Sequence, residues 1–376
     1  MSIPRTLRRF SNMPSSSPAY CSPFTRAVVS SMRKLYPESL ADKSWDNTGL
    51  LLEAPFDGSR YRQRNSVLLA IDLTKAVVDE AINRGDSVVV AYHPIIFRGL
   101  KSLTLNDSQQ TSLLRLAQAG ISVYSPHTAI DAAPGGMGDW LCDVVTGCFI
   151  SKPQDLPPAP AEQKPIPQLY TKPTYPQPTG ITANPPELKH TRKTIHPSSP
   201  PVPEGCENAG MGRLVTFSEP QPLSTIIDHI AAGVGNPGGI PIAIPQGSQL
   251  EDIRIRTVGV CPGSGSSVLM KGVSEIPDLM FTGEMSHHEA LAAIENGKVV
   301  VSLSHSNTER GYLHAVMKEK LQSALRGEWE SVRQEGIKAF EDGGSVQELE
   351  MFEDGTCEVD VSKADRDPYG IMIRRI

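Results

Sequence analysis

The 376-residue sequence lacks any apolar run of the roughly 18 residues that a membrane-spanning helix requires. Its six cysteines include no Cys-x-x-Cys pair and no dense cluster, which argues against a disulfide scaffold and a thiolate zinc site. Basic residues are in deficit, with 36 Lys and Arg against 42 Asp and Glu, so the net charge of −6 disfavours a general nucleic-acid binder. We therefore expect a soluble protein of a reducing compartment, with no membrane partner.

Apolar runs and amphipathic segments alternate along most of the chain, whose hydrophobic residues amount to 39% and suffice for a sizeable core. The runs that we expect to form strands are 66–72, 87–92, 121–124, 213–217, 240–244, 254–260, 278–281, 299–303 and 357–361. The segments that we expect to form helices are 25–36, 75–84, 109–119, 223–232, 287–296 and 309–325. This alternation predicts an α/β fold with a mainly parallel sheet, in two halves at 25–150 and 210–376. We expect Thr308 to cap the last helix, and the second half to end in a return strand.

Two segments differ in composition from these halves. Residues 1–24 are rich in Arg and Ser and contain no Asp or Glu, which is typical of a mitochondrial targeting segment and equally of a disordered basic N-terminus. An internal start at Met13 would leave a cytosolic form. Residues 151–209 hold 15 of the 32 prolines, so we expect a disordered proline-rich insertion in which His190 and His196 are solvated.

Three histidines come just after apolar strand runs, namely His93, His127 and His305. In open α/β sheets, ligands gather at the carboxyl ends of the strands. Two of these histidines have a carboxylate four residues later, Asp131 and Glu309, and imidazole with carboxylate suits zinc, manganese or iron. A single strand-end histidine is more often a hydrogen-bonded or capping residue, so the metal interpretation rests on the three together.

Two polar turns are further candidates. The loop after 254–260 contains Gly263, Ser264, Gly265 and Ser266, whose N–H groups can form an anion-binding nest, although no Gly-Lys-Ser/Thr follows as in a nucleotide-binding loop. A tight strand-to-helix turn is the alternative, and the pattern alone favours it. Cys261 ahead of it is expected to be a buried, inert thiol. In the turn Ser44–Gly49 we expect a buried Trp45, with a turn that lines a cleft as the alternative.

Seven segments occur in the order SWDNTGLLLE, AYHPIIF, HTAIDAAPGGMGDWL, GMGRL, CPGSGSSVL, TGEMSHHEAL and SHSNTERGYL. Together they resemble the NGG-interacting-factor-three family, also described as type-2 GTP cyclohydrolase I-like proteins. The resemblance covers nearly all of 25–376 except the proline-rich insertion and a charged stretch at 327–355. It implies two similar α/β halves with mixed sheets, a metal cleft between them, and a homo-oligomer in the form of a toroidal hexamer.

The resemblance also implies a site. It assigns His93, Asp131, His305 and Glu309 as ligands of one or two divalent ions per chain and places His127 beside them. Many bacterial members have His-His-Pro where this chain has Tyr92-His93-Pro94, so one imidazole ligand of a second ion is missing.

Two functions follow from the resemblance. One is a metal-dependent, GTP cyclohydrolase-like hydrolase with a nucleotide ligand, in which Glu309 and His127 move protons and the loop at 263–266 holds phosphates. The other is a non-catalytic interaction protein, a partner of transcriptional regulators with a structural or sensing metal. The expected compartment is the mitochondrion or the cytoplasm, with the nucleus as a further option.

Overall fold

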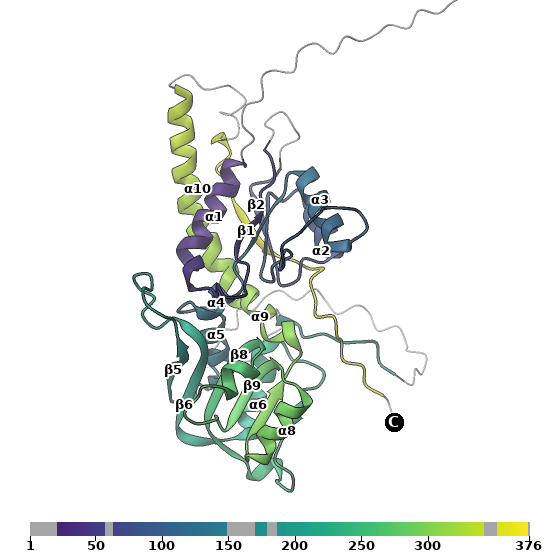
Figure 1. The fold of residues 1–376 in the computed structure, drawn as a ribbon, viewed down its shortest axis with the longest axis vertical. Coiled ribbons are helices and arrows are strands. Elements are labelled where there is room, and N and C mark those ends of the chain that lie inside the picture. Colours follow the sequence, from purple (N-terminus) through teal and green to yellow (C-terminus); the bar gives the residue numbers. More distant parts are fainter. Residues whose placement is uncertain (1–20, 57–62, 149–169, 179–185, 342–351, 375–376) are drawn as a thin grey trace, which may run out of the picture.

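The computed structural model describes residues 21–56, 63–148, 170–178, 186–341 and 352–374, which form two α/β halves stacked along the long axis of the molecule (Figure 1). Each half contains one mixed β-sheet flanked by helices. The predicted α/β class and the two mixed sheets are thereby confirmed. Among the described residues, none of the helices is both long enough and apolar enough to cross a membrane.

The first sheet has the order β1-β4-β3-β2-β11. Its strands are β1 Gly49–Leu52, β4 Ser122–Ser125, β3 Val88–Ala91, β2 Ser66–Ala70 and β11 Glu358–Val361. All neighbours are parallel except β1, which runs antiparallel to β4. The central strands are buried on both faces, which explains their continuous apolar runs.

Helices cover both faces of this sheet. Side chains alternate along each strand, so Leu68 packs with α2 Lys75–Arg84 and α3 Ser108–Ala119, whereas Val67 packs with the opposite core. That opposite face is covered by α1 Pro23–Leu35 and α10 Lys318–Glu341, and the described residues of these two helices pack against each other (Figure 1).

The second sheet has the order β5-β6-β8-β9-β10-β7. Its strands are β5 His190–Pro197, β6 Gly210–Pro222, β8 Arg254–Ser264, β9 Leu279–Glu284, β10 Val299–Ser302 and β7 Ile242–Ala243. The three strands β8, β9 and β10 are parallel, and the other pairs are antiparallel. The accompanying helices are α4 Thr128–Ala132, α5 Met137–Thr146, α6 Leu223–Val234, α7 Ser266–Met270 and α8 His287–Glu295.

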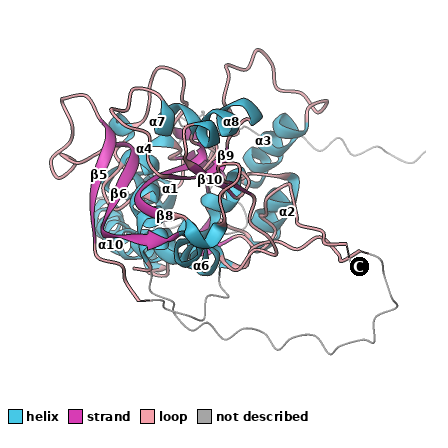
Figure 2. Cartoon of the chain, turned by 90° about the horizontal axis from the view of Figure 1, so that it is seen from below, coloured by secondary structure: helices cyan, strands magenta, loops and turns pink. Residues whose placement is uncertain are grey.

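Strand β5 lies within the segment predicted to be a disordered insertion, so that expectation fails for this part. It pairs with β6 at the edge of the second sheet, on the side away from α2 and α3 (Figure 2). An edge strand with one exposed face needs little apolar periodicity, and its only proline, Pro197, is its last residue. His190 and His196 are not simply solvated, because each ring contacts a backbone carbonyl, that of Leu188 and that of Val268. Residues 151–169 and 179–185 lie outside the described chain, as do residues 1–20.

The chain crosses from the second half back to the first after β10. A 3-10 turn at His305–Thr308 leads into α9 Arg310–Tyr312, then one π-helical turn at Leu313–Met317, and then α10. The helix was predicted to follow a Thr308 cap, but Thr308 lies inside the 3-10 turn, where its hydroxyl donates to the His305 carbonyl instead. The return strand is present at β11, and it joins the first sheet beside β2 rather than the second sheet.

Candidate metal centre

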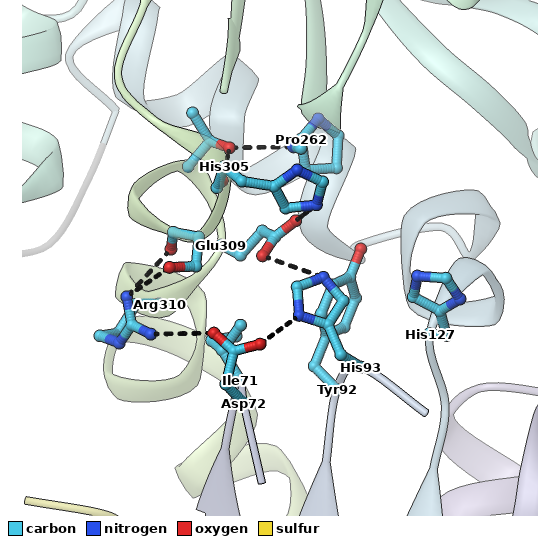
Figure 3. Close-up of polar contacts among 12 residues, drawn as sticks. Ile71, Asp72, Tyr92, His93, His127, Pro262, His305, Glu309 and Arg310 are labelled. Atoms are coloured by element: carbon cyan, nitrogen blue, oxygen red, sulfur yellow. Dashed lines mark hydrogen bonds and ion pairs between the residues drawn. The ribbon is translucent and has the colours of Figure 1, made fainter. Parts of the chain in front are cut away.

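The two halves meet at a cluster of two histidines and one glutamate (Figure 3). His93 follows β3 of the first sheet, whereas His305 and Glu309 come from the turn after β10 of the second sheet. One potential ligand atom from each residue lies within 4.8 Å of the others. The Nε2 atoms of His93 and His305 are each 3.5 Å from a different oxygen of Glu309.

Glu309 provides an independent test of whether these residues fit a metal ion. Its side chain is only 1% exposed, and its Oε2 has no hydrogen-bond partner among the residues that the structure describes. A buried carboxylate oxygen without a hydrogen bond is stabilised by a nearby cation, which a bound metal ion would supply and which a protonated His93, 3.5 Å away, supplies when no ion is bound. Two imidazoles with a carboxylate form a ligand set suited to zinc, manganese or iron, so the three residues fit a divalent ion.

The glycine-rich segment that was predicted to be a loop packs directly against this cluster, with Gly263 and Ser264 at the end of β8 and Ser266 at the start of α7. A Cβ atom on Gly263 would lie 2.7 Å from His305 Nε2 and 2.8 Å from Glu309 Oε1, and its φ of +58° also favours glycine. Its N–H donates to Thr308 Oγ1 at 3.0 Å. Gly263 therefore lies at the cluster, where glycine is needed for the close approach to His305 and Glu309.

A second layer of charged residues holds His93. Asp72, which follows β2, lies 2.9 Å from His93 Nδ1, and Arg310 lies 3.8 Å from the other oxygen of Asp72. Arg310 is itself paired with the buried Asp365 at 2.9 Å. Burial alone would raise the pKa of Asp72, but the His93 hydrogen bond and the nearby positive charges lower it below its usual value.

The same charged neighbours shift the pKa of His93. Burial alone would lower its pKa, but the negative charge of Glu309 and the hydrogen bond to Asp72 raise it to about 10. The imidazole is therefore positively charged at neutral pH when no ion is bound. His305 has a similar partner, because its Nδ1 lies 3.1 Å from Glu284 at the end of β9.

Asp131 lies behind Tyr92 rather than within the three-residue cluster. Both of its oxygens accept hydrogen bonds from the Tyr92 hydroxyl, at 2.9 and 3.0 Å. Burial and the charge of Asp131 raise the pKa of Tyr92 well above its usual value, so the phenol remains a donor. Burial likewise raises the pKa of Asp131 to about 7. The Tyr92 ring is 4.9 Å from the His93 ring, which places position 92 at the edge of the site.

His127 stands beside the cluster in a fixed orientation. Its ring centroid is 5.6 Å from that of His93, and its Nδ1 lies 2.6 Å from the fully buried carboxylate of Asp46. Burial raises the pKa of Asp46, but hydrogen bonds from His127 and Thr128 more than offset it, and the pKa is lowered. His127 has a φ of +32°, and Ser304, next to His305, has a φ of +71°. Such strained conformations cluster at functional sites.

The turn at Trp45 differs from the prediction that its indole is buried. Trp45 is 50% exposed rather than buried, and its ring lies 5.7 Å from His127 and 6.0 Å from Phe97. The turn is anchored by Asp46, which accepts from the backbone N–H and the hydroxyl of Thr128, so burial of the indole is not needed. The turn thus reaches the surroundings of His127.

Sequence reasoning missed Asp72, Asp46 and Asp365. Only Asp72 carried a local signal, because it directly follows a buried strand just as His93 follows the neighbouring one. Cys261 is a buried free thiol whose pKa is raised by burial, in agreement with its predicted inert character.

Residues 25–336 match the family described as Duf34/NIF3 (NGG1p interacting factor 3). The protein NIF3 homolog of Schizosaccharomyces pombe is 40% identical over 310 residues, which cover 81% of this chain and 93% of that protein. The NGG1-interacting factor 3 of Saccharomyces cerevisiae is 36% identical, with 78% and 89% covered. The NIF3-like protein 1 of Homo sapiens is 32% identical, with 77% and 84% covered.

Solved structures share the fold at lower identity. The Bacillus cereus protein related to NIF3 superimposes with a TM-score of 0.57 at 20% identity and covers 92% of this chain and 98% of its own. Reduced HcgD from Methanocaldococcus jannaschii gives a TM-score of 0.56 at 20% identity, with 79% and 93% covered. At this identity the likeness concerns the fold alone.

Proposed function

The chain belongs to the Duf34/NIF3 family, and we propose that it is a divalent-metal-dependent hydrolase that acts on a nucleotide. The observation that carries the proposal is the buried carboxylate of Glu309 between His93 and His305, whose Oε2 accepts no hydrogen bond among the described residues. These three residues would hold one ion of zinc, manganese or iron, with each half of the molecule contributing at least one ligand.

A second ion per chain would add Asp131 as a ligand. The family resemblance supports this assignment, as does the burial of Asp131 close enough for the charge of Glu309 to influence its pKa. The carboxylate would have to exchange its hydrogen bonds with the Tyr92 hydroxyl for the ion. We therefore propose that the second ion binds more weakly than the first.

The bound ion supplies a water of lowered pKa and hence a nucleophile near neutral pH. Proton movement is assigned to the chain's own residues. Asp46 holds Nδ1 of His127 and leaves Nε2 free to take up or release a proton. Glu309, with one oxygen toward each cluster histidine, is the second proposed proton carrier. The loop at Gly263–Ser266 is proposed to contact the nucleotide, supported by its packing against the ligand residues.

The test has two stages. Protein purified without chelator should contain at least one divalent ion per chain by elemental analysis, and Glu309→Gln should contain far less. The metal-loaded wild type should then convert a nucleotide in a panel assay, whereas His127→Gln should keep its metal and lose turnover. The exposed His288→Gln is the matched control and should behave like the wild type. A metal-loaded wild type that converts no nucleotide would refute the hydrolase proposal.

A second candidate is a non-catalytic interaction protein, a partner of transcriptional regulators whose metal site is structural or sensing. The printed name of the yeast relative, NGG1-interacting factor 3, supports it. Exposed apolar side chains on the loop after β3, among them Phe97, Leu103 and Leu105, offer a surface for contact. The same surface supports the proposed homo-oligomer, a hexamer, which light scattering of the full chain tests.

The cellular compartment depends on the N-terminal segment and on which candidate function holds. We propose the mitochondrion or the cytoplasm, and the nucleus if the protein acts with transcriptional regulators. The acid-free, Arg-rich composition of residues 1–24 supports the mitochondrial form. A C-terminal fluorescent fusion, compared with the same fusion started at Met13, separates the two forms.

A further inference from the structure

A large cavity opens next to the metal centre. It has a volume of about 870 Å³, and His93 and Asp72 form part of its wall. The N-terminal turns of α2 and α3 line it, together with the segment 363–368 near the C-terminus. This volume falls within the range of small-molecule sites, so the cavity can hold a substrate that also reaches the cluster.

The wall carries three cations, Lys75, Lys363 and Arg366. All three are exposed, and no ion pair joins any of them to a carboxylate in the part of the chain that the structure describes. Arg366 lies over the ring of Tyr175, with its guanidinium carbon 5.1 Å from the ring centroid. Stacking of this kind orients the guanidinium without neutralising its charge.

The acidic groups at the cavity are already engaged. Asp72 is paired with His93 and lies near Arg310, and Asp367 accepts from Ser306 and from the Tyr369 N–H. Glu80, close to Lys363, accepts from Ser362 and from two backbone N–H groups. Hydrogen bonds leave Asp367 and Glu80 charged, so an anion in the cavity would be recognised by the three unpaired cations and not by an overall positive charge of the wall.

The first turn of α2 adds backbone donors to the cations. The hydroxyl of its N-cap Thr74 accepts from the Val77 N–H, and the N–H groups of Lys75 and Ala76 at the cavity wall have no partner among the described residues. At α3 the carboxylate of Asp107 already accepts from two N–H groups. An anion in the cavity would thus be met by α2 and the three cations.

We propose that this cavity binds the phosphate group of a phosphorylated small-molecule substrate whose reacting part extends to His93 and Glu309. The substrate class rests on the proposed function, whereas the anion site stands on the cavity and its cations. Arg366 and the two lysines provide charge-assisted hydrogen bonds, and unpaired cations are the groups that an oxyanion requires. The Gly263 N–H is less suited to this role, because Thr308 already accepts it.

The outer wall involves the proline-rich part of the chain. Tyr175 follows Thr174, which pairs antiparallel with Ile371, and Tyr170 pairs with Arg374 in the same way. These two bridges bring the segment 170–178 beside the C-terminal segment. The part of the insertion that the structure describes therefore shapes the proposed phosphate site.

The test uses the full chain with its metal removed by a chelator, so that the cavity is measured without the ion. The cavity variant combines Lys75→Gln, Lys363→Gln and Arg366→Gln. The control variant combines Lys189→Gln, Arg256→Gln and Lys338→Gln, which removes the same charge from exposed positions elsewhere. Inorganic pyrophosphate is the probe in a calorimetric titration. We expect the wild type and the control to bind it equally, and the cavity variant to bind at least about tenfold more weakly.

Three measurements complete the design. Thermal unfolding establishes that both variants fold, and the single change Arg366→Lys should retain more affinity than Arg366→Gln. Metal titration should give the same stoichiometry for all proteins, because none of the changed residues is a proposed ligand. Equal pyrophosphate affinity in the two triple variants, or no binding by the metal-free wild type, overturns the anion site. If the wild type binds pyrophosphate but no metal ion, the anion site stands and only the proposed hydrolase is overturned.

Discussion

The two sheets repeat one arrangement at the metal centre. In the first sheet His93 follows β3 and pairs with Asp72, which follows the parallel neighbour β2. In the second sheet His305 follows β10 and pairs with Glu284 at the end of the parallel neighbour β9. The carboxyl ends of parallel strands meet at one edge of a sheet, and here two such edges face each other.

The two pairs differ in how firmly they are held. The Asp72 side chain is 33% exposed and lies near Arg310, which the buried Asp365 orients. The Glu284 side chain is 53% exposed. Exposed ion pairs are weak because water and salt screen them. The same position in the topology therefore holds a firmly positioned histidine in one half and a loosely positioned histidine in the other.

The halves also differ in how their sheets are completed. The strands of the second sheet follow one another between residues 190 and 302, whereas the first sheet takes its edge strand β11 from the end of the chain. Helix α10 from the same region covers one face of the first sheet. The first half therefore depends on residues that are distant in sequence.

The largest expected difference between the two halves comes from a charge placed in one edge strand of each sheet, β11 in the first and β7 in the second. Val359 in β11 is 1% exposed within the main core, whereas Ile242 in β7 is 38% exposed. We expect Val359→Asp to lower the free energy of unfolding by more than about 3 kcal/mol, since it buries an unpaired charge. Ile242→Asp should lower it by less than about 1 kcal/mol. Urea unfolding measures both, and similar losses would contradict the dependence of the first half on β11.

Removing the shared ligand tests the joint contribution of the two halves. Glu309→Gln takes away the one carboxylate that both cluster histidines contact. We expect metal affinity to fall by about a hundredfold or more, measured by calorimetric titration. An unchanged affinity would show that the ion binds elsewhere.

The difference between the two histidine–carboxylate pairs can be measured directly. Asp72→Asn should weaken metal binding by about 10- to 100-fold, as is usual when the group that orients a ligand histidine is changed. Glu284→Gln should weaken it by no more than about threefold, because the exposed pair contributes little. Titrations of both variants with zinc in one buffer provide the comparison. If the two losses are equal, the firmer hold on His93 has no consequence for the ion.

A further change adds a potential metal ligand on the side of the first half. Tyr92→His places an imidazole next to Asp131, where the resemblance to bacterial relatives predicts a ligand for the second ion. We expect the second ion to bind about tenfold more tightly. Tyr92→Phe is the control, since it removes the hydroxyl without adding a ligand. Metal titration that gives identical stoichiometry and affinity for both variants would remove position 92 from the site.

Local sequence determined much of the secondary structure. Helix α2 begins after Thr74 and ends before Gly85, as predicted, because the Thr74 hydroxyl accepts from the Val77 N–H and Gly85 adopts φ +70°. The apolar runs of β2 and β3 marked strands that are buried on both faces. The histidines at strand ends were visible for the same reason, because a polar residue that ends such a run is a local pattern. Capping, turns and burial of a short run depend on neighbours in sequence.

Tertiary structure alone decided which of these elements meet. The sequence of β11 does not predict that this strand pairs with β2. The sequence of the proline-rich segment likewise does not predict that β5 within it is an edge strand. The pairs His93–Asp72, His127–Asp46 and Tyr92–Asp131 join residues 21 to 81 positions apart. The shifted pKa values of His93, Asp72, Asp46, Tyr92 and Asp131 depend on burial and on charges brought close by packing. Such contacts form only when distant segments fold together, so no local pattern in the chain encodes them.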